Sequence, residues 1–222
     1  MSPPERQISC SEPEGVSPKA CMHDRILACA RTLFATRGFD ATSVRQIAEA
    51  VGVTVPALYY HFDSKRALLT ALAEDHCLRK AASVEAGLKH QGDVRSRFER
   101  ALSSYMEFMT GERETARITM RDPTLLSDPI LFTLVTESES RVAGMLADLI
   151  QEGVSEGIFT TDDPNLTAYL LLAAARSVAL SRTLGGQAGP VLAADSDDTM
   201  SKALVGLVTK GLLARPTGEA PG

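Results

Sequence analysis

The chain has 222 residues and is 44% hydrophobic, which is enough for a globular core in one or two domains. Only 5% of the residues are aromatic and none is Trp, a composition that favours helices and argues against a β-rich domain. The formal charge of −5 argues against a chain that coats nucleic acid along its whole length. Residues 19–70 nevertheless carry seven Lys and Arg against four Asp and Glu, whereas residues 71–222 carry 15 against 21. We expect an all-α protein in which a mildly basic segment precedes an acidic one.

The sequence predicts neither export nor membrane insertion. Residues 1–17 combine three prolines with Ser and Glu, and they lack both apolar periodicity and the basic-then-apolar order of a signal peptide. The longest apolar run, residues 168–175, has eight residues, far fewer than the roughly 20 that span a bilayer. None of the four cysteines lies in a C-x-x-C pair. We expect a disordered tail at 1–17, reduced thiols, no metal, no membrane partner and a cytoplasmic location.

A first amphipathic helix is predicted over residues 18–37. Ser17 supplies an N-cap, and Pro18 fits the first turn because that position has no helical N–H bond to lose. Gly38 suits the left-handed residue that ends a helix, and Arg37 complements the negative end of the helix dipole. The apolar residues that recur at helical spacing are Ile26, Leu27, Ala30, Leu33 and Phe34.

A second, short helix is predicted to begin at Thr42 or Ser43. Ser43 and Gln46 form an S-x-x-Q capping pattern, in which each side chain satisfies a free backbone N–H of the first turn. Gly52 ends the helix. The apolar face of this helix consists of Val44, Ile47, Ala48 and Val51.

A third helix follows after a very short turn. Thr54 is its predicted N-cap, Pro56 lies in its first turn, and it ends near residues 61–62. Asp63 or Ser64 caps a fourth helix that continues into the 80s. Two short helices around a glycine-containing turn, with further helices packed behind, form a helix-turn-helix, which can place one helix in a major groove about 12 Å wide.

The remaining sequence is predicted to be helical as well, with breaks at glycine- and proline-containing segments. The expected helices lie near 93–110, 113–121, 130–157, 164–184 and 198–214. We divide the chain into a tail at 1–17, a helix-turn-helix domain at 18–69, a ligand-binding and dimerisation domain at 70–215, and a disordered end at 216–222.

A resemblance to a known family lies in residues 38–69, which read GFDATSVRQIAEAVGVTVPALYYHFDSKRALL. This stretch resembles the DNA-binding signature of the TetR family of repressors. The resemblance implies a bacterial, homodimeric transcriptional regulator that binds a near-palindromic DNA operator and responds to a small-molecule effector. It implies no cofactor and no enzymatic activity.

In relatives, the second helix contacts phosphates through hydroxyls at its start, and a free helix N-terminus suits such an anion. Thr42 and Ser43 hold these positions here, although plain capping accounts for them equally well. Arg45 is placed to meet a guanine edge, or else it is an ordinary solvated arginine. The positions that match DNA-facing residues in relatives are Thr42, Ser43, Arg45, Thr54, Val55, Pro56, Tyr59, Tyr60, His61 and Lys65.

The third helix resembles the recognition helix of the family. Of Tyr59 and Tyr60, we expect one to pack and the other to bind the DNA backbone through its hydroxyl, unless both fill the space between helices. Val55 departs from the polar residue that many members carry, so it offers only apolar contact there. Lys65 opposes the dipole of the fourth helix, which makes a phosphate contact a sensible reason for it, beside the alternative of a surface lysine.

In relatives, the last two long helices pair with a second subunit. Here these helices are 164–184 and 198–214. The first is apolar over more than one face, as expected of a helix covered on both sides, either by a second copy or by a monomeric core. The second carries a single apolar stripe.

A ligand cavity in the second domain is implied by the resemblance, and the sequence offers Met and aromatic residues as adaptable lining. Ordinary core packing is the alternative for each of them. Arg176 meets either an anionic ligand group or a partner across the dimer interface. The candidates are Tyr105, Met109, Met120, Phe132, Met145, Tyr169 and Arg176, with a largely apolar effector.

Two other functions compete with that of a regulator. An enzyme is disfavoured because the chain contains no E-x-x-H, H-E-x-x-H, G-x-S-x-G, Walker-type or G-x-G-x-x-G motif. A helical scaffold with a decayed DNA-binding part is supported only by Val55 and the modest basic charge of residues 19–70. Activation in place of repression is left open, because the position of the operator decides it.

Overall fold

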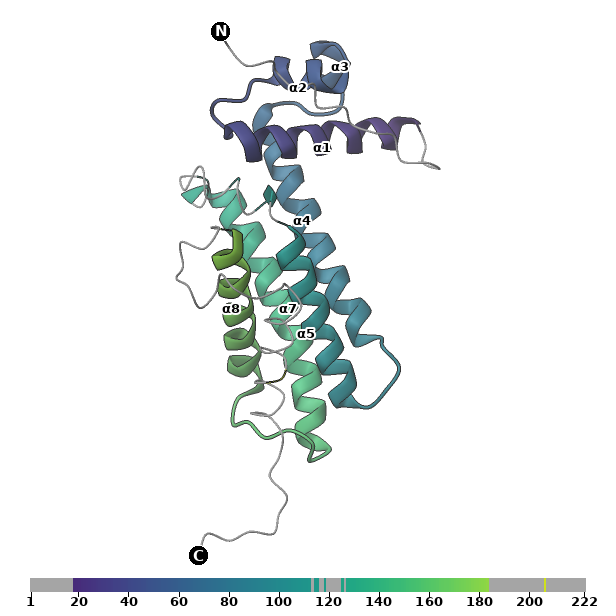
Figure 1. The fold of residues 1–222 in the computed structure, drawn as a ribbon, viewed down its shortest axis with the longest axis vertical. Helices are drawn as coiled ribbons and strands as arrows, with labels where there is room; N and C mark the ends of the chain where they lie inside the picture. The colour runs from purple at the N-terminus through teal and green to yellow at the C-terminus, as the bar shows by residue number, and fades with distance from the viewer. Residues whose placement is uncertain are drawn as a thin grey trace, which may run out of the picture. The chain divides into compact units, whose positions relative to one another are not determined.

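The computed structural model describes residues 18–112, 114–115, 118, 125, 127–183 and 206. Every named element in this part of the chain is a helix, and the predicted all-α fold is confirmed. The helices are α1 (Pro18–Arg37), α2 (Val44–Val51), α3 (Val55–Tyr59), α4 (Lys65–Leu88), α5 (Val94–Gly111), α7 (Pro129–Ser155) and α8 (Pro164–Thr183) (Figure 1). Of the predicted helix at 113–121 the structure describes only residues 114, 115 and 118, which are helical, and of the one at 198–214 only residue 206.

The chain forms two compact units, each with its own apolar core. The first unit comprises residues up to 76 together with 114–134, and the second comprises 77–113 together with the residues from 135 onward. The division therefore falls inside α4, later than the boundary after Leu69 that we predicted. The membership of residues 114–134 in the first unit was not anticipated from the sequence.

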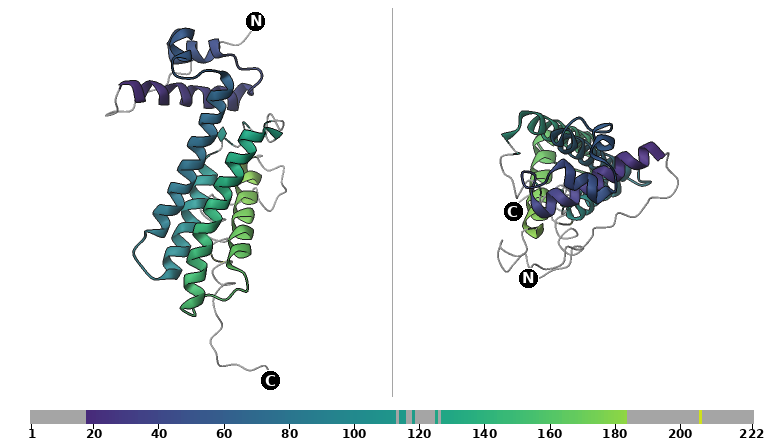
Figure 2. Two further views of the ribbon diagram at one scale, coloured as in Figure 1. Left: turned by 180° about the vertical axis from the view of Figure 1, so that it is seen from behind. Right: turned by 90° about the horizontal axis from the view of Figure 1, so that it is seen from above.

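The first unit is built on α1, whose predicted apolar face is fully covered. Helix α2 contacts both α1 and α3, and α2 and α3 lie together on one side of α1 (Figures 1 and 2). Burial of these side chains is what holds such short helices, which are unstable on their own. The shared core includes Ile26, Ala30, Leu33 and Phe34 of α1, Ile47 and Val51 of α2, Leu58 of α3, and Leu68, Leu69 and Leu72 of α4.

The turn between α2 and α3 depends on caps that the sequence predicted. The Ser43 side chain accepts a hydrogen bond from the Gln46 backbone, and the Gln46 side chain accepts one from the Ser43 backbone, which completes the capping box. Gly52 adopts the left-handed conformation at φ +80°, and its N–H donates to carbonyls of the last turn of α2. The Thr54 side chain accepts from Ala57 N at 3.3 Å and so caps α3. The helix-turn-helix is thereby specified locally.

The second unit is a bundle of the later part of α4, α5, most of α7, and α8, which run side by side (Figure 1). Gly87 marks the closest approach of α4 to α5: a Cβ at this position would lie 2.4 Å from Ala101 Cα, so only glycine fits. The core of the unit includes Phe98, Leu102, Met106, Leu146, Ile150, Phe159 and Leu172. Within the described part of the chain, none of the helices combines the length and the apolar character needed to cross a membrane.

Candidate nucleic-acid interface

An exposed face of the first unit is formed by α2, α3 and their flanking residues. Arg45 and Thr54 are exposed, and Tyr59 and Tyr60 are 46% and 72% exposed. The opposite sides of these helices are packed into the core of the first unit, where Ile47 is 0% exposed. This packing holds the exposed side chains in a defined position. A cation, hydroxyls and aromatic rings with polar tips on one rigid face are the groups that contact phosphates and base edges in DNA.

Arg45 is available for an external partner. It lies in the first turn of α2, is exposed, and makes no ion pair with any described residue. Its guanidinium presents several N–H donors in a fixed plane, which matches two adjacent acceptors such as O6 and N7 of guanine.

The two hydroxyls predicted at the start of α2 have different surroundings. Thr42 is buried at 1% exposure, and its Oγ1 donates to the carbonyl of Gly38 at 2.7 Å and lies 3.4 Å from the carbonyl of Leu33. Ser43 is exposed, although its hydroxyl is engaged with Gln46 in the capping box. The Thr42 hydroxyl therefore serves the fold, and only Ser43 faces solvent.

Neither tyrosine of α3 is packed into the core, contrary to the expectation that one of them packs. The ring of Tyr60 lies edge-on to half-buried His61 with centroids 5.5 Å apart. Val55 packs against the core of the first unit and is half-buried, whereas Pro56 is exposed. The surface of α3 therefore offers aromatic rings and Pro56, with Val55 only partly accessible.

Lys65 is tied to the loop between α1 and α2. Its Nζ donates to the carbonyl of Phe39 at 2.8 Å, lies 3.5 Å from the carbonyl of Asp40, and sits 4.2 Å from the centroid of the Phe39 ring. An ammonium group has three N–H donors, so these contacts leave capacity for a phosphate oxygen as well. The geometry combines support for the loop with a positive charge near the exposed face.

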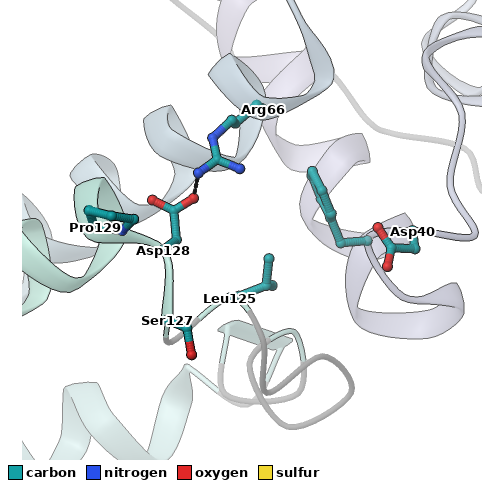
Figure 3. Close-up of a pocket in the computed structure, with 7 residues that line it drawn as sticks. Asp40, Arg66, Leu125, Ser127, Asp128 and Pro129 are labelled. Atoms are coloured by element: carbon teal, nitrogen blue, oxygen red, sulfur yellow. Dashed lines mark ion pairs between the residues drawn. The ribbon is translucent and has the colours of Figure 1, made fainter.

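An ion pair that the sequence does not predict joins Arg66 and Asp128 within the first unit (Figure 3). Asp128 is 7% exposed and caps α7, because its Oδ1 accepts from Ile130 N at 2.9 Å and Leu131 N at 3.2 Å. The pair borders an open pocket lined also by Phe39, Asp40, Leu125, Ser127 and Pro129. The order Asp-Pro at 128–129 is a cap signal visible in the sequence, but the pairing with Arg66 is not.

The candidate ligand-lining residues are only partly brought together. Tyr105 is fully buried in the core of the second unit, and Met109 and Met145 pack against that core. Arg176 pairs with Glu139 at 3.7 Å. Within the described part of the chain, Phe132 is 60% exposed and Tyr169 is 57% exposed, so neither side chain lies in a cavity wall there. Phe132 also belongs to the first unit. Met120 lies outside the described residues.

Comparison with known proteins gives both parts of the chain a counterpart. The family model for bacterial regulatory proteins of the tetR family matches residues 26–72, and the model for the tetracyclin repressor-like C-terminal domain matches residues 91–180. The HTH-type transcriptional repressor KstR2 of Rhodococcus jostii is 28% identical over 203 residues, which cover 90% of this chain and 95% of that protein.

Two further comparisons bear on activity and on fold. The HTH-type transcriptional activator FasR of Mycolicibacterium smegmatis is 30% identical over 94 residues, which cover 42% of this chain and 43% of that protein. A crystal structure of a tetR-family regulatory protein from Rhodococcus RHA1 superposes with a TM-score of 0.70 at 20% identity, covering 90% of this chain and 100% of the other. With its helix-turn-helix and C-terminal domain both matched, the chain belongs to the TetR family of DNA-binding transcriptional regulators.

Proposed function

We propose that the protein is a homodimeric repressor that binds a near-palindromic operator and leaves it when a small-molecule effector binds. The observation that carries the proposal is the exposed face of α2 and α3, where Arg45, Tyr59 and Tyr60 project from a fully packed core. The similarity to KstR2, named a repressor, over 90% of the chain favours repression. Activation is the second candidate, since FasR is named an activator.

Within this proposal, each side chain of the face has a role that its surroundings support. Arg45 reads a base edge, and Val55 and Pro56 offer apolar contact to a base. Ser43, Thr54, Tyr59, Tyr60, His61 and Lys65 contact the sugar–phosphate backbone. Thr42 acts indirectly, by holding the turn before α2.

A homodimer is supported by the apolar surface of α8. Leu166, Tyr169 and Leu170 are each more than half exposed, and they recur at the spacing of one helix face. Large apolar side chains grouped in this way mark a surface that another element covers. We propose that α8 and residues 198–214 together form the interface with a second copy, and that the protein acts in the cytoplasm on chromosomal DNA.

The test is binding to a labelled DNA fragment from immediately upstream of the protein's own gene, measured by fluorescence anisotropy over a range of salt concentrations. We expect the affinity to fall linearly on a log–log scale as salt rises, because phosphate contacts release counterions. Arg45→Ala should weaken binding roughly ten- to a hundredfold, as expected for loss of a base contact of about 1–3 kcal/mol.

The matched control is Arg100→Ala, which removes an exposed arginine from the second unit. This variant should bind the fragment as the unchanged protein does. Equal affinity of Arg45→Ala and Arg100→Ala would show that Arg45 makes no base contact, and a helical scaffold becomes the better description if no fragment shows salt-dependent binding.

A further inference from the structure

Four helices of the second unit each direct one polar side chain to a common point. These side chains, here called the polar cluster, are Lys80 of α4, Tyr105 of α5, Glu139 of α7 and Arg176 of α8. Lys80 Nζ lies 2.6 Å from Glu139 Oε1. Arg176 Nη1 lies 3.7 Å from Glu139 Oε2. Both Glu139 and Arg176 lie close enough to Tyr105 to act on its ionisation.

The polar cluster is buried at one end and reaches solvent at the other. Tyr105 is 0% exposed and Lys80 is 2% exposed. Such complete burial is rare for a lysine. The side chain of Glu139 is 17% exposed and that of Arg176 is 44% exposed. The Arg176 guanidinium is therefore the part of the polar cluster that solvent reaches, and the two buried donors lie beneath it.

Hydrogen-bond donors outnumber acceptors in the polar cluster. The Tyr105 hydroxyl is buried and has no hydrogen-bond partner among the described residues. Burial, and then the nearby Glu139 carboxylate, raise the pKa of Tyr105 well above its ordinary value, so the phenol keeps its proton and remains a donor. The Lys80 ammonium has three donors, of which the contact with Glu139 uses one. Buried polar groups in proteins are nearly always bonded, so an acceptor is missing here.

The net charge of the polar cluster indicates whether the missing acceptor is neutral or anionic. Two cations, buried Lys80 and partly exposed Arg176, face one carboxylate, so the polar cluster carries a formal charge of +1 and favours an anionic acceptor over a neutral one. A ligand carboxylate supplies one negative charge and two acceptor oxygens. We propose that the polar cluster binds the carboxylate of an otherwise apolar effector, an inference that rests on the proposed function as an effector-responsive regulator.

The apolar part of such an effector has suitable neighbours. One helical turn from members of the polar cluster lie Met109 after Tyr105, Ala143 after Glu139 and Leu172 before Arg176. All three belong to the apolar core of the second unit or pack against it. Met109 and Met145, which pack against the same core, are half-buried, and methionine side chains adapt readily to the shape of a ligand.

The experiment measures calorimetric binding of straight-chain fatty acids with eight to fourteen carbons, each below its micelle concentration, beside the alcohols of equal length. We expect at least one acid to bind at least tenfold more tightly than its alcohol. Tyr105→Phe and Arg176→Gln should each weaken binding of that acid at least fivefold and leave binding of the alcohol unchanged. Arg95→Gln, which alters an exposed arginine paired with Glu99 on α5, should change neither.

A second measurement separates ligand binding from damage to the fold. Without ligand, Tyr105→Phe should melt at the same temperature as the unchanged protein or higher, since it removes a buried hydroxyl that has no described partner and keeps the ring. The proposal is overturned if no acid binds, if acids bind no better than alcohols, or if Tyr105→Phe leaves the acid affinity unchanged.

The same samples keep this inference distinct from the proposed function. DNA binding is followed by anisotropy with the upstream fragment and without acid. Normal DNA binding together with no calorimetric binding of any acid removes the carboxylate proposal and leaves a DNA-binding regulator. Tight acid binding without DNA binding removes the regulator proposal and keeps the carboxylate site.

Discussion

At the scale of single residues, Thr42 shows that a hydroxyl at a helix start can serve the fold. Its Oγ1 donates to the Gly38 carbonyl at 2.7 Å in a site that is 1% exposed. Thr42→Val keeps the shape and removes the hydroxyl, which leaves a buried acceptor without its donor. We expect the free energy of unfolding to fall by about 1–2 kcal/mol, measured by urea denaturation.

Operator affinity distinguishes this role from a phosphate contact. Well below the melting temperature, Thr42→Val should bind the upstream fragment within about twofold of the unchanged protein. The control is Thr36→Val, because the Thr36 hydroxyl is exposed and bonds only its own helix backbone, so its loss should cost less than about 0.5 kcal/mol. An unaltered stability together with a weaker operator affinity would instead show that Thr42 contacts DNA.

At the scale of elements, the turn between α2 and α3 requires a left-handed residue. Gly52 has φ +80°, and no described atom lies within 4 Å of a Cβ added there, so the cost of alanine is confined to the backbone. Gly52→Ala should lower the free energy of unfolding by about 1–2 kcal/mol. Gly144→Ala is the matched control: it lies within α7 with equal open space, and alanine there should be neutral or stabilise by up to about 1 kcal/mol. Equal effects of the two variants, measured by thermal unfolding, would contradict this account of the turn.

The elements also show how far the sequence predicts the molecule. The Ser43–Gln46 capping box, the Thr54 cap and the stop at Gly52 were predictable because each is decided by residues within one helical turn. The contacts of Lys65 with the Phe39 carbonyl and of Lys80 with Glu139 were not, since their partners are 26 and 59 positions away in the chain. Such pairs depend on how the helices pack.

In the candidate sites too, some exposures are predictable from the sequence and others depend on how the helices pack. The exposure of Arg45 follows from helical periodicity, because the apolar positions of α2 fix which face of that helix turns outward. The exposure of Phe132 does not follow, since an aromatic residue in an apolar stretch is expected to be buried. Periodicity predicts which residues share a face, and only packing decides whether that face is covered.

At the scale of the whole molecule, DNA recognition by the proposed homodimer depends on two copies. Two recognition helices about 34–36 Å apart fit successive turns of the major groove, so the second copy contributes directly to operator affinity. Leu166 and Leu170 lie on the exposed face of α8, and each is more than half exposed. Replacing both by Glu puts two charges on the proposed interface, where they would lose hydration on dimerisation.

The double variant Leu166→Glu/Leu170→Glu should therefore elute as a folded monomer, with helical circular dichroism unchanged and a mass measured by light scattering equal to one chain. Its operator affinity should fall at least a hundredfold, because one half-site replaces two. Leu78→Glu is the control, since Leu78 is 64% exposed on a different helix, α4; this variant should remain a dimer. A double variant that stays dimeric would mean that the exposed face of α8 is covered from within the same chain, and the second copy would have to meet a different surface.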